Sequence, residues 1–310
     1  MISPPVRAQL EKLLGPDVSF DAPMSRCTSM RVGGPADALV RAPDRAKLAA
    51  TLALAAAEGI PVSIIGEGFN TVVTDAGLDG IALKLSGLRR LELQGDDGGE
   101  QTLLAEAGVR HASITRLCIE ASVAGLEFAA GIPGSVGGWL AMNAGIGVRE
   151  MKDATLAVEW MSADGSQSAW SGADELGFEY RALRGLPEGS VIVAGRFAVT
   201  KAEPGAVKQQ VDEHMAHRTR TQPVNSPSCG SVFRNPDGDF AGRLIEAAGL
   251  KGLRVGGACV SEIHANFIVT ETGTKAADVL ELIDRVRDRV QAESGVRLET
   301  EVKVIGRKAS

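Results

Sequence analysis

The sequence predicts an α+β protein of two or three domains, and three observations support this prediction. The 310 residues exceed what one ordinary hydrophobic core accommodates. Stretches with the apolar spacing of helices alternate with short runs typical of strands. Hydrophobic residues make up 44% of the chain and charged residues 23%, as in ordinary globular proteins. We therefore expect helices and strands that pack together as separate domains.

The first fifth of the chain predicts a helix followed by a βαβ-like unit. A serine and two prolines begin a short amphipathic helix over 3–15, which we expect to be exposed. A glycine–proline turn leads into a strand within 33–41. Asp44 caps an alanine-rich helix that ends at Gly59, and 61–65 is predicted to be a buried strand.

A glycine-containing turn follows this strand directly, which is the position expected of a phosphate-binding loop. Its sequence is Gly66-Glu67-Gly68-Phe69-Asn70-Thr71. The turn is not the dinucleotide-binding fingerprint, because its sixth position is threonine and no helical pattern follows. A plain hairpin turn remains the alternative for this loop.

The middle of the chain combines several strands with one amphipathic helix that begins at His111. These elements are expected within 80–93, 102–109, 111–124, 155–160, 178–181 and 190–200. The proline and glycine at 204–205 interrupt the pattern and mark a domain boundary.

The glycine-rich stretch 126–145 is the strongest functional signal in the residues themselves. It contains Gly131, Gly134, Gly137, Gly138 and Gly145. Such a density of glycine weakens a helix or strand but lets backbone N–H groups approach a bulky ligand closely. Successive N–H dipoles suit phosphate or the polar edge of a ring system. A tight turn between packed elements is the alternative, but two such loops after strand-like runs favour a large bipartite cofactor.

The last third begins with a charged helix over 206–221. His214 and His217 lie three residues apart on it, and we interpret them as a solvated helix face because no third metal ligand is near. Three prolines then stiffen a loop over 222–236 that carries small hydroxyl and thiol side chains. Within this loop Ser231 is either a turn residue or a reagent.

A helix capped by Thr274 and closed by Gly295 is predicted next, followed by an alternating strand over 296–304. The carboxylates on the polar face of this strand have two interpretations. They are either solvated or, if that face lines a cleft with Arg181 and Ser231, a source of an acid/base group.

Charge and cysteine content restrict the function classes. A net charge of −6 argues against a nucleic-acid surface, although a few arginines in a cleft can still attract an anionic substrate. The four cysteines lack the spacing of a disulfide framework or a zinc site, so we expect reduced thiols and no metal. No signal peptide or membrane-spanning run is present, which predicts a cytoplasmic protein without a membrane partner.

Six motifs occur together in an order known from one family. They are 28–36 (TSMRVGGPA), 131–138 (GIPGSVGG), 142–145 (MNAG), 180–181 (YR), 227–236 (PSCGSVFRNP) and 299–302 (ETEV). The chain is similar to the UDP-N-acetylenolpyruvoylglucosamine reductase (UDP-N-acetylmuramate dehydrogenase) family, flavoenzymes of early peptidoglycan synthesis. Its length and short connections resemble the compact subclass that lacks a tyrosine-bearing insertion.

The resemblance implies a fold and a domain organisation. An FAD-binding domain of the vanillyl-alcohol-oxidase/PCMH type would span 27–204, with subdomains of about 27–85 and 86–204. A helical preamble, 1–26, would precede it, and an α+β domain for the UDP-sugar would occupy 205–310.

The resemblance also implies the chemistry. NADPH would reduce the flavin, which would pass hydride to the C3 methylene of UDP-N-acetylglucosamine-enolpyruvate. Ser231 would donate the proton to C2, and Arg181 and a protonated Glu301 would stabilise the enolate-like intermediate through its carboxylate.

The remaining site residues are carried over motif by motif. Those implied to contact FAD are Gly66, Glu67, Gly68, Phe69, Asn70, Thr71, Gly131, Ile132, Pro133, Gly134, Ser135, Gly137, Gly138, Asn143, Ala144 and Gly145. Those implied to contact the substrate are Tyr180, Arg218, Gln222 and Asn235. We expect a monomer or a weak dimer.

Several positions depart from the family pattern. Phe69 replaces a serine that would contact the diphosphate, and Glu67 adds a negative charge beside it. Trp139 and the stretch 146–149 differ from the usual residues near the flavin loop. Thr221 and Ile263 stand where some relatives have lysine. These departures motivate two alternatives, namely a related FAD oxidoreductase with another substrate and a flavin-binding module without catalysis.

Overall fold

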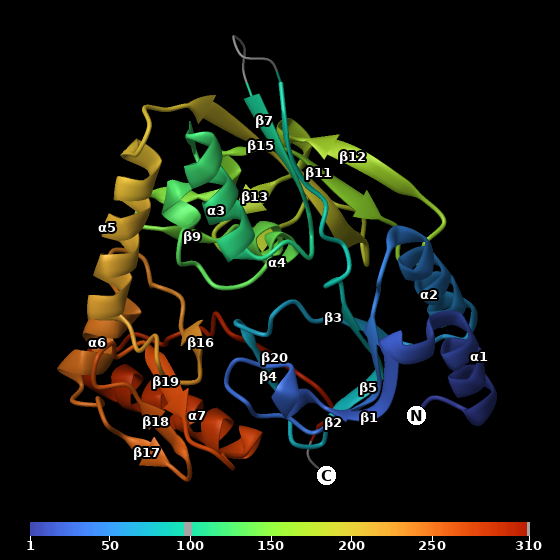
Figure 1. Cartoon of the computed structure of the whole chain (residues 1–310). Helices are drawn as coiled ribbons and strands as arrows, with labels where there is room; N and C mark the ends of the chain where they lie inside the picture. The colour runs from blue at the N-terminus through green and yellow to red at the C-terminus, as the bar shows by residue number, and fades with distance from the viewer. Residues whose placement is uncertain (96–100, 309–310) are drawn as a thin grey trace. The chain divides into compact units, whose positions relative to one another are not determined.

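The computed structural model describes residues 1–95 and 101–308, and the chain divides into two compact units. Unit 1 comprises 1–20, 38–66 and 80–217, and unit 2 comprises 21–37, 67–79 and 218–310. Both units combine helices with strands, which confirms the predicted α+β class (Figure 1). The predicted domain boundaries near 26, 85 and 204 remain predictions.

The N-terminal part of unit 1 packs two helices on short strands. Its elements are α1 (Pro4–Leu14), α2 (Arg45–Ala57), β3 (Val62–Ile64) and the unit 1 portions of β1 (Val18–Pro23), β2 (Pro35–Arg41) and β5 (Leu78–Lys84). The sheet order is β1-β2-β5-β3, and β3 runs parallel to β5. Asp44 caps α2 as predicted, because its carboxylate accepts a hydrogen bond of 2.7 Å from the Lys47 N–H.

Two expectations about burial in this region were wrong. Helix α1 is not exposed, because its apolar face, including the fully buried Leu10, joins a core with α2. Strand β3 is not buried, because Ile64 is 45% exposed and the strand lies at the edge of its sheet. A short apolar run does not reveal whether its strand is central or at an edge.

The larger sheet of unit 1 has the order β12-β11-β15-β7-β6, with β8 paired to β15. Its strands are β6 (Leu91–Gln94), β7 (Gln101–Glu106), β8 (Val123–Ala124), β11 (Thr155–Met161), β12 (Ser168–Gly172) and β15 (Val191–Lys201). Helices α3 (His111–Ala121) and α4 (Val136–Ala141) share its core with the first turns of α5 (Ala206–Thr221). The predicted strand-rich region and the helix beginning at His111 are thereby confirmed.

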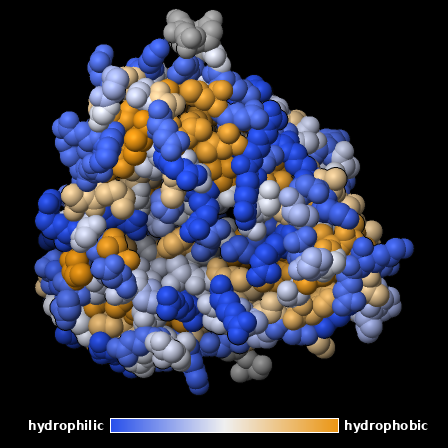
Figure 2. Space-filling view, in the orientation of Figure 1, coloured by the Kyte–Doolittle hydropathy of each residue, from blue (hydrophilic) through white to orange (hydrophobic). Residues whose placement is uncertain are grey.

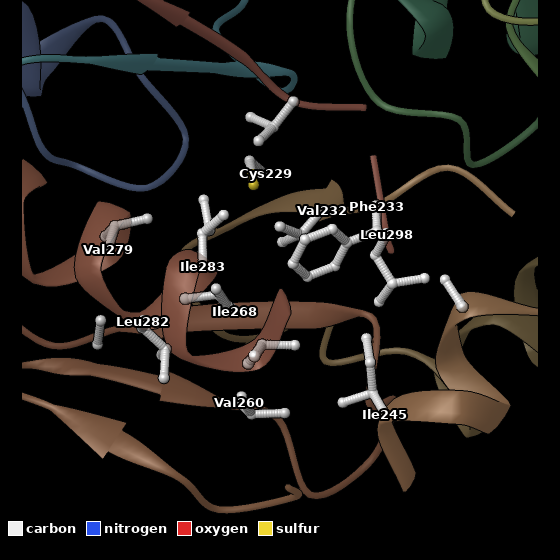
Figure 3. Packing of buried hydrophobic residues seen from close by; sticks show 14 of the residues in the cluster. Cys229, Val232, Phe233, Ile245, Val260, Ile268, Val279, Leu282, Ile283 and Leu298 are labelled. Carbon is white, nitrogen blue, oxygen red and sulfur yellow. The ribbon is translucent and has the colours of Figure 1, made fainter. Parts of the chain in front are cut away.

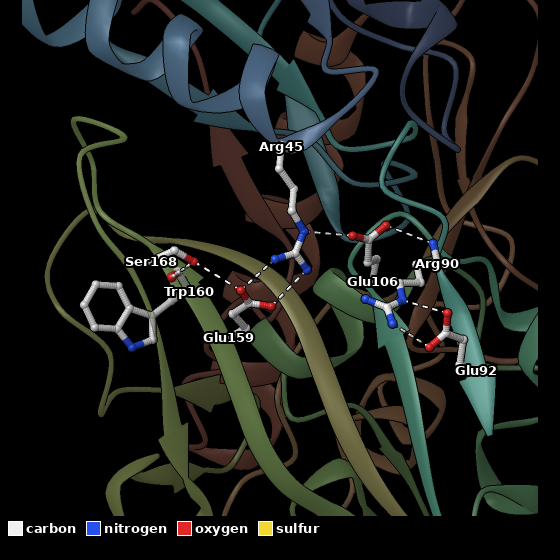
Figure 4. Close-up of polar contacts among 7 residues, drawn as sticks. All are labelled: Arg45, Arg90, Glu92, Glu106, Glu159, Trp160 and Ser168. Carbon is white, nitrogen blue, oxygen red and sulfur yellow. Dashed lines mark hydrogen bonds and ion pairs between the residues drawn. The ribbon is translucent and has the colours of Figure 1, made fainter. Parts of the chain in front are cut away.

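A charged cluster ties α2 to this sheet (Figure 4). Arg45 donates to both oxygens of Glu159 at 2.6 and 2.9 Å and to Glu106 at 2.9 Å. Glu106 also accepts the Arg90 N–H at 2.9 Å, and Glu159 accepts the Ser168 hydroxyl at 3.2 Å. Every carboxylate of the cluster is thus compensated by charge and hydrogen bonds.

Unit 2 forms one core below the strand that carries Ser231. Its elements are β4 (Thr71–Val73), β16 (Ser228–Ser231), α6 (Ala241–Ala247), β17 (Arg254–Val255), β18 (Ala258–Val260), β19 (Phe267–Thr270), α7 (Ala276–Ser294) and β20 (Lys303–Ile305). The antiparallel sheet has the order β16-β19-β18-β17, and β20 pairs with β4 in parallel. Cys229, Val232 and Phe233 point into the core formed with Ile283 and Leu298 (Figure 3).

The end of the chain differs from its prediction in two details. Helix α7 begins one residue later than expected, because Lys275 is the N-cap while the Thr274 hydroxyl donates to the Glu271 carbonyl at 2.7 Å. Gly295 closes the helix at φ +74° as predicted. The following strand is only β20, and Val304 is exposed rather than sharing the buried face of Leu298 and Val302.

The segment 67–79 is part of unit 2 although more than a hundred residues separate it from the next unit 2 segment, which begins at Arg218. Asp75 accepts hydrogen bonds of 2.9 Å from the N–H groups of both Ala276 and Ala277. Two N–H groups of the first turn of α7 are therefore satisfied by a residue distant in sequence.

Hydrophilic and hydrophobic residues are mixed over the face shown in Figure 2. Among residues 1–95 and 101–308, no helix is both long and apolar enough to cross a membrane.

Candidate active site

In the turn 66–71, hydrogen bonds fix the orientation of one peptide group. Its carbonyl faces the protein backbone, and its N–H points away from it. Gly68 has φ +72°, and an added Cβ would lie 2.2 Å from the Cys27 carbonyl oxygen. Ser29 donates to the Gly68 carbonyl through its N–H at 3.1 Å and its hydroxyl at 2.9 Å. Because a peptide group is planar and trans, the Phe69 N–H of the same peptide points in the opposite direction.

The glycine loop of unit 1 repeats this arrangement. The Gly134 carbonyl accepts the His111 N–H at 3.2 Å, so the Ser135 N–H points the other way. Within the described part of the chain, neither this group nor the Phe69 N–H donates to a protein acceptor. An added Cβ at Gly134 or Gly138 would meet open space. In unit 1 the Cβ position of Gly66 lies 3.9 Å from the Ser135 Oγ, so this end of the first turn is close to the second loop.

These features fit the expected FAD. Ser135 is buried, and a buried N–H without an acceptor is unfavourable unless a ligand or water supplies one. Phosphate oxygens and the polar edge of an isoalloxazine ring are suitable acceptors. The glycines leave room for them, because no side chain fills the space beside Gly134 and Gly138.

Two departures from the family pattern have a structural explanation. Trp139 is buried, and its indole N–H donates to the Ile132 carbonyl at 3.2 Å, so it supports the glycine loop from the protein interior. The stretch 146–149 forms the turn of a hairpin in which β9 (Gly145–Ile146) pairs with β10 (Arg149–Glu150). Arg149 lies 5.1 Å from the Phe128 ring centroid, as in a cation–π contact.

Asn143 organises the end of the glycine loop. It is fully buried at φ +37°, a region that asparagine tolerates better than most residues. Its amide nitrogen donates to Glu150 at 2.9 Å and to the Glu179 carbonyl at 3.0 Å, and its oxygen accepts the Lys152 N–H at 3.0 Å. Asn143, predicted to contact FAD, thus uses its side chain inside the protein.

Arg181 lies beside this asparagine in unit 1. It follows Tyr180 in the two-residue turn between β13 (Phe178–Glu179) and β14 (Ala182–Leu183). Its guanidinium donates to the carbonyls of Asn143 at 3.4 Å and Gly145 at 3.3 Å and to Glu150 at 3.4 Å. Its φ of +57° is strained for a residue with a Cβ, and such strain concentrates at functional sites.

Ser231 is presented by an irregularity in β16. The pairing of β16 with β19 shifts register between Ser228 and Ser231, where Gly230 has φ +75°. Cys229 and Val232 are buried on either side, whereas Ser231 is only half-buried. The sequence left open whether Ser231 is a turn residue or a reagent, and the structure places it at the end of strand β16.

Glu301 lies on the segment next to Ser231. Its N–H donates to the Val232 carbonyl at 2.8 Å. Burial raises the pKa of Cys229 to about 12, and the electrostatic interaction with Glu301 adds to this increase. The structure thus brings Ser231 and Glu301 together in unit 2, and Arg181 together with Asn143 and Gly145 in unit 1.

The expected substrate residues differ in how they are held. Arg218 donates to Gln222 at 3.0 Å, and burial lowers the pKa of Arg218. The Asn235 oxygen accepts the Ala241 N–H at 3.1 Å, so this side chain supports the start of α6. Tyr180 lies partly exposed, with its ring centroid 4.8 Å from the Arg181 guanidinium carbon.

Sequence reasoning missed three supporting residues. Ser29 fixes the first turn, and Glu150 contacts both Asn143 and Arg181. Asn266 is buried and pairs with both the N–H and the carbonyl of Phe233, at 2.9 and 2.8 Å. A polar residue within an apolar run was the available signal for Asn266, because a buried amide requires partners.

All four cysteines are buried and free, and burial also raises the pKa of Cys118 to about 12. In the parts of the chain that the structure describes, no group of three or more His, Cys, Asp or Glu side chains is arranged to hold a metal ion.

Comparisons with known proteins cover both units. Residues 36–169 match the family model described as FAD binding domain. Residues 222–305 match the model described as UDP-N-acetylenolpyruvoylglucosamine reductase, C-terminal domain. A protein named UDP-N-acetylenolpyruvoylglucosamine reductase from Syntrophus aciditrophicus is 42% identical over 97% of this chain and 96% of its own. One of the same name from an Anaeromyxobacter species is 44% identical over 97% and 92%.

Solved structures agree with these matches. The UDP-N-acetylenolpyruvylglucosamine reductase of Thermus caldophilus has a TM-score of 0.77 and 34% identity, covering 93% of this chain and 97% of its own. A VAO-type flavoprotein of Myceliophthora thermophila has a TM-score of 0.50 at 12% identity, covering 97% and 63%. The second likeness concerns the fold alone. It agrees with the predicted FAD-binding domain of the vanillyl-alcohol-oxidase type, which is thereby confirmed.

Proposed function

This chain belongs to the UDP-N-acetylenolpyruvoylglucosamine reductase family, and on that premise we propose that it is an FAD-dependent UDP-N-acetylmuramate dehydrogenase. It uses NADPH to reduce the enolpyruvyl ether of UDP-N-acetylglucosamine-enolpyruvate to UDP-N-acetylmuramate, a peptidoglycan precursor. The observation that carries this proposal is 42% identity along 97% of the chain, which includes both glycine turns and the Ser231 strand.

The cofactor is held by backbone groups. The outward N–H groups of Phe69 and Ser135 are offered as donors to FAD, and Gly134 and Gly138 leave space for it. When bound, FAD takes reducing equivalents from NADPH and delivers them to the C3 methylene of the substrate. The protein contributes binding, orientation and the handling of charge and protons.

Three side chains act on the substrate in this proposal. Arg181, as a cation, and Glu301, as a protonated carboxyl group that donates a hydrogen bond, stabilise the negative charge that develops toward the substrate carboxylate as C3 becomes saturated. Ser231 donates its hydroxyl proton to C2, which completes the reduction of the C2–C3 double bond. A serine hydroxyl is a weak acid, but an enolate carbon is basic enough to accept its proton. Arg218, which donates a hydrogen bond to Gln222, is proposed to contact the UDP-sugar together with Gln222.

Ser231→Ala tests this assignment. We expect the variant to retain FAD, and NADPH to bleach its flavin absorption as rapidly as in the wild-type protein. Transfer to the UDP-enolpyruvyl sugar should slow by about 10²-fold or more, because the proton donor is lost. Ser226→Ala is the matched control, since Ser226 is an exposed hydroxyl of the same loop.

Three results would reject the proposal. One is absence of turnover in a wild-type preparation loaded with FAD, which favours another substrate. The second is a Ser231→Ala variant as active as Ser226→Ala. The third is a purified protein that neither contains nor binds flavin.

The proposed substrates also suggest a location. UDP-sugars and NADPH are metabolites of the cytoplasm, and we propose that the protein acts there. The expected monomer or weak dimer stays a prediction.

A further inference from the structure

We propose that Glu150 is a positioning residue that aims Arg181 at the substrate carboxylate without neutralising it, and that Lys152 keeps it from doing so. This inference rests on the proposed function. It concerns residues that the family resemblance did not assign, and all of its contacts lie within unit 1.

Glu150 stands at the centre of three donors. One of its oxygens faces Arg181 Nη1 at 3.4 Å. The other accepts from Asn143 Nδ2 at 2.9 Å and faces Lys152 Nζ at 3.0 Å. The Glu150 side chain is only 16% exposed, whereas that of Lys152 is 49% exposed. A poorly solvated carboxylate is therefore held by a buried amide and shared by two cations.

The way Glu150 is placed indicates a built arrangement rather than a chance surface contact. In the β9–β10 hairpin Glu150 lies opposite Gly145, and a Cβ on that glycine would come within 2.8 Å of Glu150 Cγ. The glycine therefore allows the glutamate to lie across the end of the flavin loop. Both Asn143 and Arg181 hold positive φ angles beside it, so two strained residues converge on one carboxylate.

The distances show that Glu150 orients Arg181 weakly. The Arg181 contacts within this cluster are 3.3–3.4 Å long, near the limit of a hydrogen bond. Two of the three acceptors are neutral carbonyls. The strongest contacts of Glu150 go instead to Asn143 and Lys152, and this ion pair raises the pKa of Lys152. The long Glu150–Arg181 contact is therefore one that an incoming carboxylate can replace.

Glu150→Gln tests how residue 150 orients Arg181, because glutamine keeps the size of glutamate but not its charge. Asn143, Arg181 and Lys152 all present donors to position 150, so a glutamine must turn its N–H₂ group toward one of them. The oxygen will stay with the two closer donors, which leaves the N–H₂ group against Arg181. We expect transfer to the enolpyruvyl substrate to slow by about tenfold through kcat, with KM changed less than threefold and flavin reduction by NADPH unchanged.

Lys152→Gln gives a second measurement that does not depend on a buried substitution. Without the lysine, the charge of Glu150 acts on Arg181 alone and competes with the substrate carboxylate. We expect calorimetric affinity for UDP-N-acetylglucosamine-enolpyruvate to fall about threefold, and Lys152→Arg to restore it. A purely structural role for this surface lysine would not make substrate affinity depend on charge.

Glu179→Gln is the control, because Glu179 lies on the same hairpin as Arg181 but its exposed carboxylate pairs with Arg184. The inference fails if Glu150→Gln behaves as Glu179→Gln does, or if both half-reactions fall together with the melting temperature. It also fails if Lys152→Gln binds substrate as the wild type does. Absence of wild-type turnover would instead reject the proposed function, and the two failures are thus distinguishable.

Discussion

Two arginines of unit 1 differ in the lengths of the hydrogen bonds that they donate to neighbouring groups. Arg45 is the first residue of α2 and makes three charged hydrogen bonds of 2.6–2.9 Å to Glu106 and Glu159 (Figure 4). Arg181 occupies a strained turn, and its contacts with Asn143, Gly145 and Glu150 are 3.3–3.4 Å long. Both are arginines beside buried or half-buried acids, and they differ in the contacts just described: those of Arg45 are short and bidentate, whereas those of Arg181 with these three residues are long.

The difference distinguishes a structural cation from a reactive one. A guanidinium with short bonds to two carboxylates has little to offer a ligand, whereas one oriented by long bonds keeps its charge available. The positive φ of Arg181 agrees with this interpretation, because strained backbone is common at functional sites. The geometry of the contacts, rather than the presence of an ion pair, supports the role proposed for Arg181.

The largest effect is expected from Arg181→Met. Transfer to the enolpyruvyl substrate should slow by about 10²-fold or more, because charge developing on the carboxylate loses its preorganised cation. The free energy of unfolding should change by less than about 0.5 kcal/mol, since the contacts of Arg181 with Asn143, Gly145 and Glu150 are all long. Stopped-flow kinetics and urea unfolding measure the two quantities, with the exposed Arg184→Met as control. If Arg181→Met lost as much stability as Arg45→Met, Arg181 would be a structural cation like Arg45.

Arg45→Met should reverse this pattern. It leaves Glu106 and Glu159 without their cation, and we expect a loss of about 2 kcal/mol in the free energy of unfolding. This is below the ~3–5 kcal/mol of a fully buried pair, because the Arg45 side chain is 38% exposed. Arg45→Lys should lose about half as much, since lysine keeps the charge but not the fork. Reaction rates of the folded variants should stay within about twofold of wild type, and a tenfold loss would contradict the structural role.

Arg181→Gly examines the strain directly. Glycine adopts φ +57° without a steric penalty, so we expect this variant to gain about 0.5 kcal/mol of stability while losing activity. Arg184→Gly, three residues after Arg181 and at an ordinary φ, should lose a similar amount. Thermal unfolding of the two variants measures this difference. If both melting temperatures shift in the same direction, backbone strain at Arg181 does not distinguish it from Arg184.

The smallest effect concerns pH. The hydrogen bonds that Arg45 donates to Glu159 are the largest cause that raises the pKa of Arg45, and burial opposes them. A cation with a raised pKa stabilises the fold fully below its unfolded pKa and stops doing so only as pH rises through the folded value. Because the pKa of arginine lies far above about pH 10, the stability gap between wild type and Arg45→Met should be equal at about pH 7 and about pH 9. A gap that narrows at the higher pH would show that another group titrates in the cluster.

Local signals in the sequence were sufficient for most of the fold. Asp44 before an alanine-rich run and Gly295 after a helical stripe marked their helices, because caps act within a few residues. The exposure of Ile64 and the burial of α1 were mispredicted, since they depend on neighbours supplied by distant segments. The same limit applies to the Asp75 carboxylate that caps α7.

The candidate site was predictable as motifs but not as contacts. The glycines and the serine of the proline-rich loop stood out by residue type, whereas the roles of Glu150 and Asn266 arise only from pairing across the fold. Trp139 was a departure from the family pattern near the flavin loop, and only the structure shows that its indole N–H supports the loop by donating to the Ile132 carbonyl. Residue type indicates which chemistry is possible, and tertiary structure decides which side chains are left to perform it.

The contribution of residues 67–79 to unit 2 bears on how members of this family can be recombined. A C-terminal fragment that begins at about residue 205 would lack β4, the partner of β20. It would also lack Asp75, whose carboxylate accepts hydrogen bonds from the first turn of α7. Swapping C-terminal halves between relatives at that point would therefore join mismatched surfaces. A chimera that transfers 21–37 and 67–79 along with everything after 218 would keep each hydrophobic core of a single origin.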